Sequence, residues 1–150
     1  MKVLFLCDGL APFVIGGMQQ HSTMLVRHLA PLVEHVTLMH CGIPNEQPVS
    51  SNTVLRALND PRNVTVIGVE FEDNEGLPGH YLRACKRLSS KFFRLAGRLE
   101  NFDVIYAQGL TGNAFLGNHE KVVVNLHGLE MFQPSFSWRE QIEKAWLRPA

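Results

Sequence analysis

A glycine-bearing loop, residues 8–17, follows the first apolar run of the sequence and directly precedes a helical stretch. The loop contains Gly9, Pro12 and the adjacent pair Gly16 and Gly17. Adjacent glycines let the backbone approach a ligand closely, and the first N–H groups of a helix can bind an anion. One interpretation is therefore a phosphate or diphosphate site at the glycine pair. The alternative is a tight turn between a strand and a helix.

Polar side chains also follow two later apolar runs, at 103–107 and 121–126. They are Gln108 and Thr111, with Gly109 between them, after the first run, and His127 and Glu130 after the second. In open parallel sheets, ligands bind beyond the carboxyl ends of the strands. We therefore expect the histidine to contact substrate, and the amide and hydroxyl groups to suit a substrate that bears hydroxyls. The alternative for the histidine is a loop residue bonded to backbone.

Several common catalytic motifs do not occur. No Gly-x-Gly-x-x-Gly follows the first strand, and the second ends in Met39, His40 and Cys41 without the acidic residue that would hold a ribose. A redox dinucleotide domain is thus disfavoured, and a P-loop motif is absent. The seven histidines lack the spacing of a metal site, and no serine lies in a nucleophile elbow. We predict no metal and no cofactor, and interpret Cys41 as a core or rim residue.

The segment 79–99 has the two-sided pattern of an amphipathic helix. One face carries basic residues, which are Arg83, Arg87, Lys91, Arg94 and Arg98. The opposite face carries apolar residues, which are Leu88, Phe92, Leu95 and Leu99. The basic face is interpreted either as a solvated surface above a core stripe, or as a patch that attaches to an anionic membrane surface or anionic substrate.

The elements that must position these residues alternate between strands and helices. Strands are expected at 2–7, 35–41, 63–69, 103–107 and 121–126. Helices are expected at 18–29, near 54–58 within a long loop, at 79–99, at 111–116 and at 137–147. An acidic stretch, 70–76, is expected to be a surface loop. Continuous apolar strands separated by helices predict an α/β domain with a Rossmann-like, doubly wound parallel sheet and helices on both faces.

Composition narrows the class of protein further. The chain has 150 residues, 45% of them hydrophobic, with 14 basic and 14 acidic residues and zero net charge. This length suits one domain, and the charge balance argues against broad nucleic-acid binding. The number and spacing of the three cysteines do not suit a disulfide framework or a zinc knuckle. They fit reduced thiols in the cytosol. The first apolar run stops at Asp8, too short for a signal peptide. We therefore predict a cytoplasmic protein, with attachment at the inner face of a membrane as a further possibility.

Taken in order, four segments resemble the N-terminal half of GT-B fold glycosyltransferases, specifically the retaining glycosyltransferase family 4. Residues 1–6 with 16–21 resemble the first strand and Gly-Gly loop of that family, and 34–38 resemble its second strand. Residues 102–109 resemble its fourth strand, and 123–130 resemble its His-Gly strand end. The resemblance covers about residues 1–130 and implies that this chain is one half of a GT-B fold.

The resemblance also implies roles for individual residues. Gly16 and Gly17 would approach the diphosphate of a nucleotide-sugar donor, and His127 would act as the catalytic residue that contacts the transferring sugar. A glycan or lipid-linked acceptor would face a further set of residues, which are Gln20, His21, Gln108, Gly109, Thr111 and Glu130. The family often has a histidine where Gln108 stands. Such enzymes need no bound metal, because helix dipoles and basic groups stabilise the leaving diphosphate.

Domain organisation follows from the same resemblance. In this family the donor nucleotide binds mainly to a second Rossmann-like domain, and nothing after Glu130 fits that domain. We therefore expect residues 1–150 to be a single N-terminal, acceptor-side domain that lacks the C-terminal donor-binding domain and is inactive alone. The alternative is a free-standing, non-enzymatic Rossmann-like module that binds a ligand or associates with itself.

Overall fold

The computed structural model describes residues 1–73, 80–99, 101–118, 121–126, 137–138 and 141–142. Five parallel strands form one sheet: β1 (Lys2–Cys7), β2 (His35–His40), β3 (Val64–Gly68), β4 (Val104–Gln108) and β5 (Val122–Asn125). The helices are α1 (Gly17–Leu29), α2 (Ser51–Ala57) and α3 (His80–Ala96), with short 3-10 helices η1 (Ala30–Leu32) and η2 (Gly109–Phe115). The strand order is β3-β2-β1-β4-β5.

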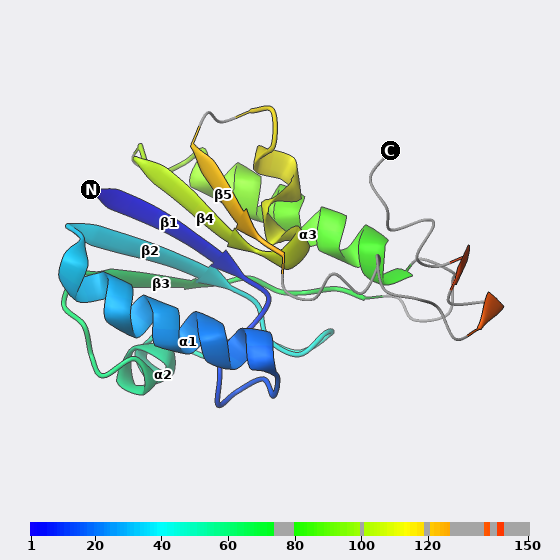
Figure 1. The fold of residues 1–150 in the computed structure, drawn as a ribbon. Helices are drawn as coiled ribbons and strands as arrows, with labels where there is room; N and C mark the ends of the chain where they lie inside the picture. The colour runs from blue at the N-terminus through cyan, green and yellow to red at the C-terminus, as the bar shows by residue number, and fades with distance from the viewer. Residues whose placement is uncertain (74–79, 100, 119–120, 127–136, 139–140, 143–150) are drawn as a thin grey trace.

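The sheet is covered on both faces, as Figure 1 shows. On one face Leu4 and Leu6 of β1 join a buried cluster with residues of α3 and η2. On the other face Phe5 and Cys7 pack in a second cluster with residues of α1 and α2. Successive side chains of a strand point to opposite faces, so a central strand needs apolar residues at every position. This arrangement confirms the predicted α/β, Rossmann-like, doubly wound parallel sheet.

The limits of the elements agree closely with the pattern in the sequence. β1 spans the predicted residues, while α3 ends at Ala96 and η2 begins at Gly109. α2 begins earlier than expected because Ser50 caps it: the Ser50 hydroxyl accepts a hydrogen bond from the Thr53 backbone N–H at 3.3 Å. In the predicted helix 137–147, the Gln141 N–H donates to the Ser137 carbonyl at 3.0 Å, and the rest lies outside the described residues.

In its described part, residues 70–73, the acidic stretch forms no helix or strand, as predicted, but it lies only partly at the surface. Phe71 and Asp73 are buried, whereas Glu70 and Glu72 between them are exposed. This alternation places every second side chain of an extended segment against the core. The segment therefore packs beside α3 instead of projecting into solvent.

In the part of the chain that the structure describes, no helix is both long enough and apolar enough to span a membrane.

Candidate functional site at the carboxyl edge of the sheet

The first turn of α1 lies across the carboxyl ends of β1 and β4, on the side toward which the strands point in Figure 1. The Gln19 amide donates a hydrogen bond to Asp8 Oδ1 at 3.1 Å, just beyond β1. His21 Nδ1 lies 3.2 Å from Nε2 of Gln108, the last residue of β4. Because an amide nitrogen only donates, this contact requires a His21 tautomer whose Nδ1 is unprotonated. Two contacts between distant segments thus build this edge.

Gly16 and Gly17 begin α1 but have different surroundings. Gly16 is the N-cap, and no described side chain caps the helix. A Cβ on Gly16 would lie 2.1 Å from Gln19 Oε1, so the space beside Gly16 is filled by the Gln19 amide. A Cβ on Gly17 would meet nothing within 4 Å. Only Gly17 therefore has the open surroundings that close approach of a diphosphate requires.

The residues predicted to face an acceptor are brought together only in part. Gln20 and His21 are exposed on α1, whereas Gln108 is fully buried beneath them. Gly109 has a φ of 57°, which glycine adopts without strain and which turns the chain from β4 into η2. The hydroxyl of Thr111 is also buried and lies 2.7 Å from the Gln108 carbonyl and 3.2 Å from the Leu6 carbonyl. Thr111 therefore holds this turn in place.

His127 and Glu130 lie outside the described residues. The last residue of β5, Asn125, is the register partner of Gln108 in the neighbouring strand. Its amide donates a hydrogen bond to the Tyr106 hydroxyl at 3.1 Å. Asn125 thus lies beside Gln108, which contacts His21. In the sequence, Asn125 stands two residues before the predicted catalytic histidine.

Asp8 belongs to this edge but was not among the predicted site residues. Burial raises the pKa of its carboxyl, against hydrogen bonds from its own backbone N–H and from Gln19. Carboxyls that are desolvated in this way are concentrated at functional sites. The available sequence clue was position alone, because Asp8 directly follows the central strand.

The three cysteines lie near Asp8 but are not nucleophiles. Burial raises the pKa of the Cys7 and Cys41 thiols, and burial also raises that of Cys85 to about 11. All three thiols are therefore protonated at neutral pH. The Cys41 thiol donates a hydrogen bond to the Asp8 carbonyl at 2.9 Å and is buried. This confirms Cys41 as a core residue at the rim of the sheet.

The end of β2 carries a buried histidine where a dinucleotide-binding domain would have a ribose-binding acid. His40 Nδ1 lies 3.0 Å from the Cys41 carbonyl, while Nε2 has no hydrogen-bond partner among the described residues. Burial lowers the pKa of His40, which keeps the ring neutral at pH 7. The side chain lies close to Gly68 of β3 and offers no group to a ligand at the surface.

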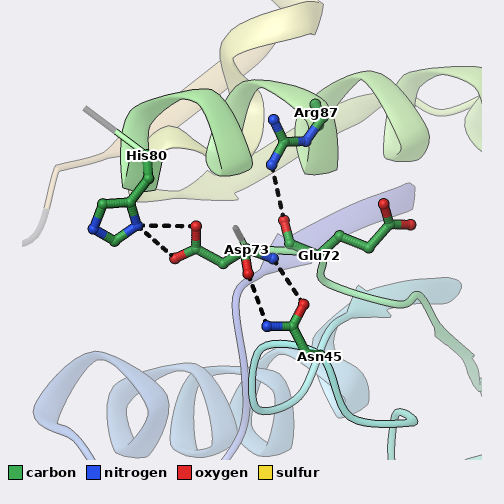
Figure 2. Close-up of polar contacts among 5 residues, drawn as sticks. All are labelled: Asn45, Glu72, Asp73, His80 and Arg87. Carbon is green, nitrogen blue, oxygen red and sulfur yellow. Dashed lines mark hydrogen bonds and ion pairs between the residues drawn. The ribbon is translucent and has the colours of Figure 1, made fainter. Parts of the chain in front are cut away.

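A polar clamp formed by Asn45, Asp73 and His80 fixes the segments around this edge, as Figure 2 shows. The Asn45 amide donates to the Asp73 carbonyl at 2.8 Å, and Asn45 Oδ1 accepts from the Asp73 N–H at 3.1 Å. His80 Nδ1, at the start of α3, lies 3.0 Å from both carboxylate oxygens of Asp73. The clamp therefore joins the loop after β2, the segment after β3 and the beginning of α3.

The basic face of α3 is partly occupied by the same acidic segment. Lys91 Nζ lies 2.6 Å from a Glu72 carboxylate oxygen, and this contact lowers the pKa of Glu72. Arg87 donates to the Glu72 carbonyl at 3.2 Å, also drawn in Figure 2. Arg83 and Arg94 are exposed on α3, and exposed Arg98 lies just beyond its end. The predicted patch thus remains basic, but Glu72 reduces its charge.

Two shallow hollows on the described surface lie away from the carboxyl edge. One, of about 270 Å³, runs along the basic face between Arg87 and Arg94. The other, of about 450 Å³, lies toward the amino ends of the strands, with Lys2, His35 and Thr37 in its lining. Within the described residues, no group of three His, Cys, Asp or Glu side chains could hold a metal ion.

Comparisons with known proteins bear on the fold. No protein-family model matches the chain, and no curated protein matches it closely enough to count as a relative. Among solved structures, the C-terminal domain of a hydrogenase from Pyrococcus furiosus is similar, with a TM-score of 0.51 and 14% identity. The match covers 83% of this chain and 91% of that chain. At this identity the similarity shows a shared α/β fold, which many unrelated activities use.

Proposed function

We propose that this chain is the acceptor-side domain of a retaining, GT-B fold glycosyltransferase, which transfers a sugar from a nucleotide-sugar donor to a glycan or lipid-linked acceptor. One observation carries the proposal: segments that resemble the family meet at one edge of the sheet. His21 of the Gly-Gly segment contacts Gln108 of the fourth-strand segment, which pairs with Asn125 two residues before His127. Fold alone would not support the proposal, because one fold hosts many functions.

The proposed donor contact is at the beginning of α1. No side chain of the described residues caps this helix, and its first turn contains no acidic residue. The N–H groups at the beginning of a helix and the helix dipole favour an anion, and they would stabilise the charge on the leaving diphosphate. Gly17 leaves this backbone open. His127 takes the catalytic role by resemblance.

Half of a two-domain site should bind its ligand weakly. In the proposed enzyme, the nucleotide is held mainly by a second domain that contributes its own contacts. An exposed apolar side chain of the loop, Ile15 at 98% exposure, is consistent with a surface that another domain or a second copy covers. A free-standing binding module, the alternative function, would instead hold its ligand fully and tightly.

Calorimetric titration of the 150-residue chain with UDP-glucose and GDP-mannose separates these functions. We expect dissociation constants in the millimolar range for at least one donor, because only the diphosphate finds its contacts. Submicromolar binding would favour the complete, free-standing module. Heat indistinguishable from dilution at 20 mM of both donors would contradict the proposed diphosphate contact.

We also propose that the basic face of α3 attaches to anionic membrane surfaces. Arg83, Arg94 and Arg98 are exposed, and they extend the charge beyond the part that Glu72 covers. Sedimentation with vesicles should show binding that rises with phosphatidylserine content and falls with salt. Equal binding to neutral phosphatidylcholine vesicles would rule out electrostatic attachment.

A further inference from the structure

The larger hollow, of about 450 Å³, lies toward the amino ends of β1, β2 and β3, at the end of the sheet marked N in Figure 1. It opens on the face that α3 covers, because Lys2 of its lining points to the same side of β1 as Leu4 and Leu6, which pack in the cluster with α3. Small-molecule sites have volumes of this order. The hollow is far from Gly17, so the proposed sugar transfer does not use it.

The sheet is polar where it forms the bottom of this hollow. Nearer the carboxyl ends, Leu6, Met39 and Ile67 are register partners and pack in the cluster with α3. The corresponding positions toward the amino ends place Thr37 beside Thr65. The opposite face of the same two strands stays apolar at this level, with Val36, Leu38, Val64 and Val66. Hydroxyl groups therefore occupy positions where a sheet covered on both faces would carry apolar side chains.

Thr37 is buried in this hollow without a hydrogen-bond partner for its hydroxyl in the described part of the chain. The residue is only 6% exposed, and it lines the hollow. The neighbouring side chains of Thr65 and His35 likewise make no hydrogen bond to any described residue. A buried hydroxyl without a partner costs free energy, and a ligand that pairs with it recovers this cost. Three polar groups on two adjacent strands are thus available to one ligand.

The wall beside these polar groups is apolar and firmly held. It consists of Ile67, Leu99 and Phe102. Next to Phe102, the Asp103 N–H donates to the Lys2 carbonyl at 2.9 Å, and the Lys2 N–H donates to the Asp103 carboxylate at 2.7 Å. These two hydrogen bonds fix the wall against β1. An apolar wall beside a few convergent polar groups is the usual composition of a small-molecule site.

The charges of the lining favour an anion that accepts hydrogen bonds. Lys2 supplies a positive charge, and the hydroxyls of Thr37 and Thr65 can donate. The acidic residue of the lining, Glu34, lies 3.5 Å from the N-terminal amino group, which offsets its charge. A carboxylate accepts several hydrogen bonds at once, and hydrogen bonds to a charged acceptor are the stronger kind. The lining therefore fits a carboxylate joined to an apolar body.

We propose that this hollow binds a small organic carboxylate that carries an apolar ring or chain. The carboxylate lies at Lys2 and Thr37, and the apolar body packs against Leu99 and Phe102. This second ligand site goes beyond the proposed function and does not depend on it. Because nucleotide sugars are expected at the other end of the sheet, either site can fail its test while the other passes.

Amide shift mapping of the ¹⁵N-labelled 150-residue chain with 3-phenylpropanoate tests the site. We expect saturable shifts at His35, Thr37 and Thr65, with a dissociation constant of about 1 mM or less, and no shift at Gly17. 3-Phenylpropylammonium has the same ring with the opposite charge, and it should bind about tenfold more weakly. No saturable shift at these residues with up to about 20 mM of the carboxylate would overturn the proposal. Equal affinity for the ammonium compound would overturn it as well.

Thr37→Val removes the hydroxyl at nearly constant volume. Because this hydroxyl has no partner among the described residues, the variant should unfold in urea at the same concentration as the natural chain or a higher one. Its affinity for 3-phenylpropanoate should fall about fivefold, since one hydrogen bond to the carboxylate is lost. An unchanged affinity in a folded Thr37→Val chain would overturn the proposal.

Thr23→Val is the matched control. Thr23 is also buried, but its hydroxyl lies 3.0 Å from the carbonyls of both Ala11 and Gln19. Valine there should lower stability toward urea and leave the affinity for 3-phenylpropanoate unchanged. If both valine variants lost affinity equally, the effect of Thr37 would be general and not a contact with the ligand, which would contradict the proposed site.

Lys2→Gln tests the charge. It should weaken 3-phenylpropanoate binding about threefold and reduce the dependence of that binding on salt. Affinity and salt dependence equal to those of the natural chain would contradict the placement of the carboxylate at Lys2.

Discussion

Gly17→Glu should lower the affinity for a nucleotide-sugar donor at least tenfold without destabilising the chain. The proposed diphosphate lies at the open beginning of α1, so a carboxylate introduced there would meet the donor anion at close range. Two like charges about 5 Å apart repel by about 1–3 kcal/mol at a protein surface, and tenfold corresponds to about 1.4 kcal/mol. Calorimetry against the donor that binds the natural chain measures the effect.

The same substitution should preserve folding because acidic residues in the first turn of a helix interact favourably with its dipole. Gly17→Gln is the matched control, since it adds the same volume without charge and should reduce affinity much less. The difference between the two variants should shrink as salt is added. Equal losses in both variants would mean that bulk, and not charge, is excluded at this position, contrary to a diphosphate contact.

Asn45→Ala should lower the free energy of unfolding by about 1–3 kcal/mol, the usual cost of leaving buried polar groups unpaired. The Asn45 side chain satisfies both the N–H and the carbonyl of Asp73, and Asp73 is buried. Alanine removes both hydrogen bonds and leaves the clamp of Figure 2 without its link to the loop after β2. Urea unfolding followed by circular dichroism measures the change.

Asn52→Ala provides a control for the loss of an asparagine. Asn52 is exposed on α2, where alanine has the higher helix propensity, so this variant should be as stable as the natural chain or slightly more stable. If Asn45→Ala were as stable as Asn52→Ala, the two hydrogen bonds between Asn45 and Asp73 would not hold the loop after β2 to the segment after β3.

The fold was predictable because its strands are continuous apolar runs. β1 has no polar residue between Val3 and Cys7, and such a run is stable only where helices cover both faces of a sheet. The partial burial of the acidic segment was missed because its charge outweighed a weaker pattern. Val69, Phe71 and Asp73 alternate with Glu70 and Glu72, and this period of two indicated an inward side.

The meeting of these residues at one edge of the sheet was predictable, but their contacts were not. Parallel topology brings Gly17, His21 and Gln108 to one edge, as expected from their positions after strands. The contact between His21 and Gln108 joins residues 87 positions apart, and only the packing of α1 against the sheet determines it. Asp8 was missed because its burial, and the Gln19 amide over Gly16, are consequences of that same packing.

The most direct test is a map of backbone amide shifts in the ¹⁵N-labelled chain during titration with UDP-glucose and GDP-mannose. We predict the largest shifts for at least one donor at Gly17, Met18 and His21, with smaller ones at Gly109 across the edge. The larger hollow, near Lys2 and His35 at the opposite end of the sheet, should be unaffected. Shifts concentrated at that hollow, or no shifts at saturating donor, would contradict a ligand site at the carboxyl edge.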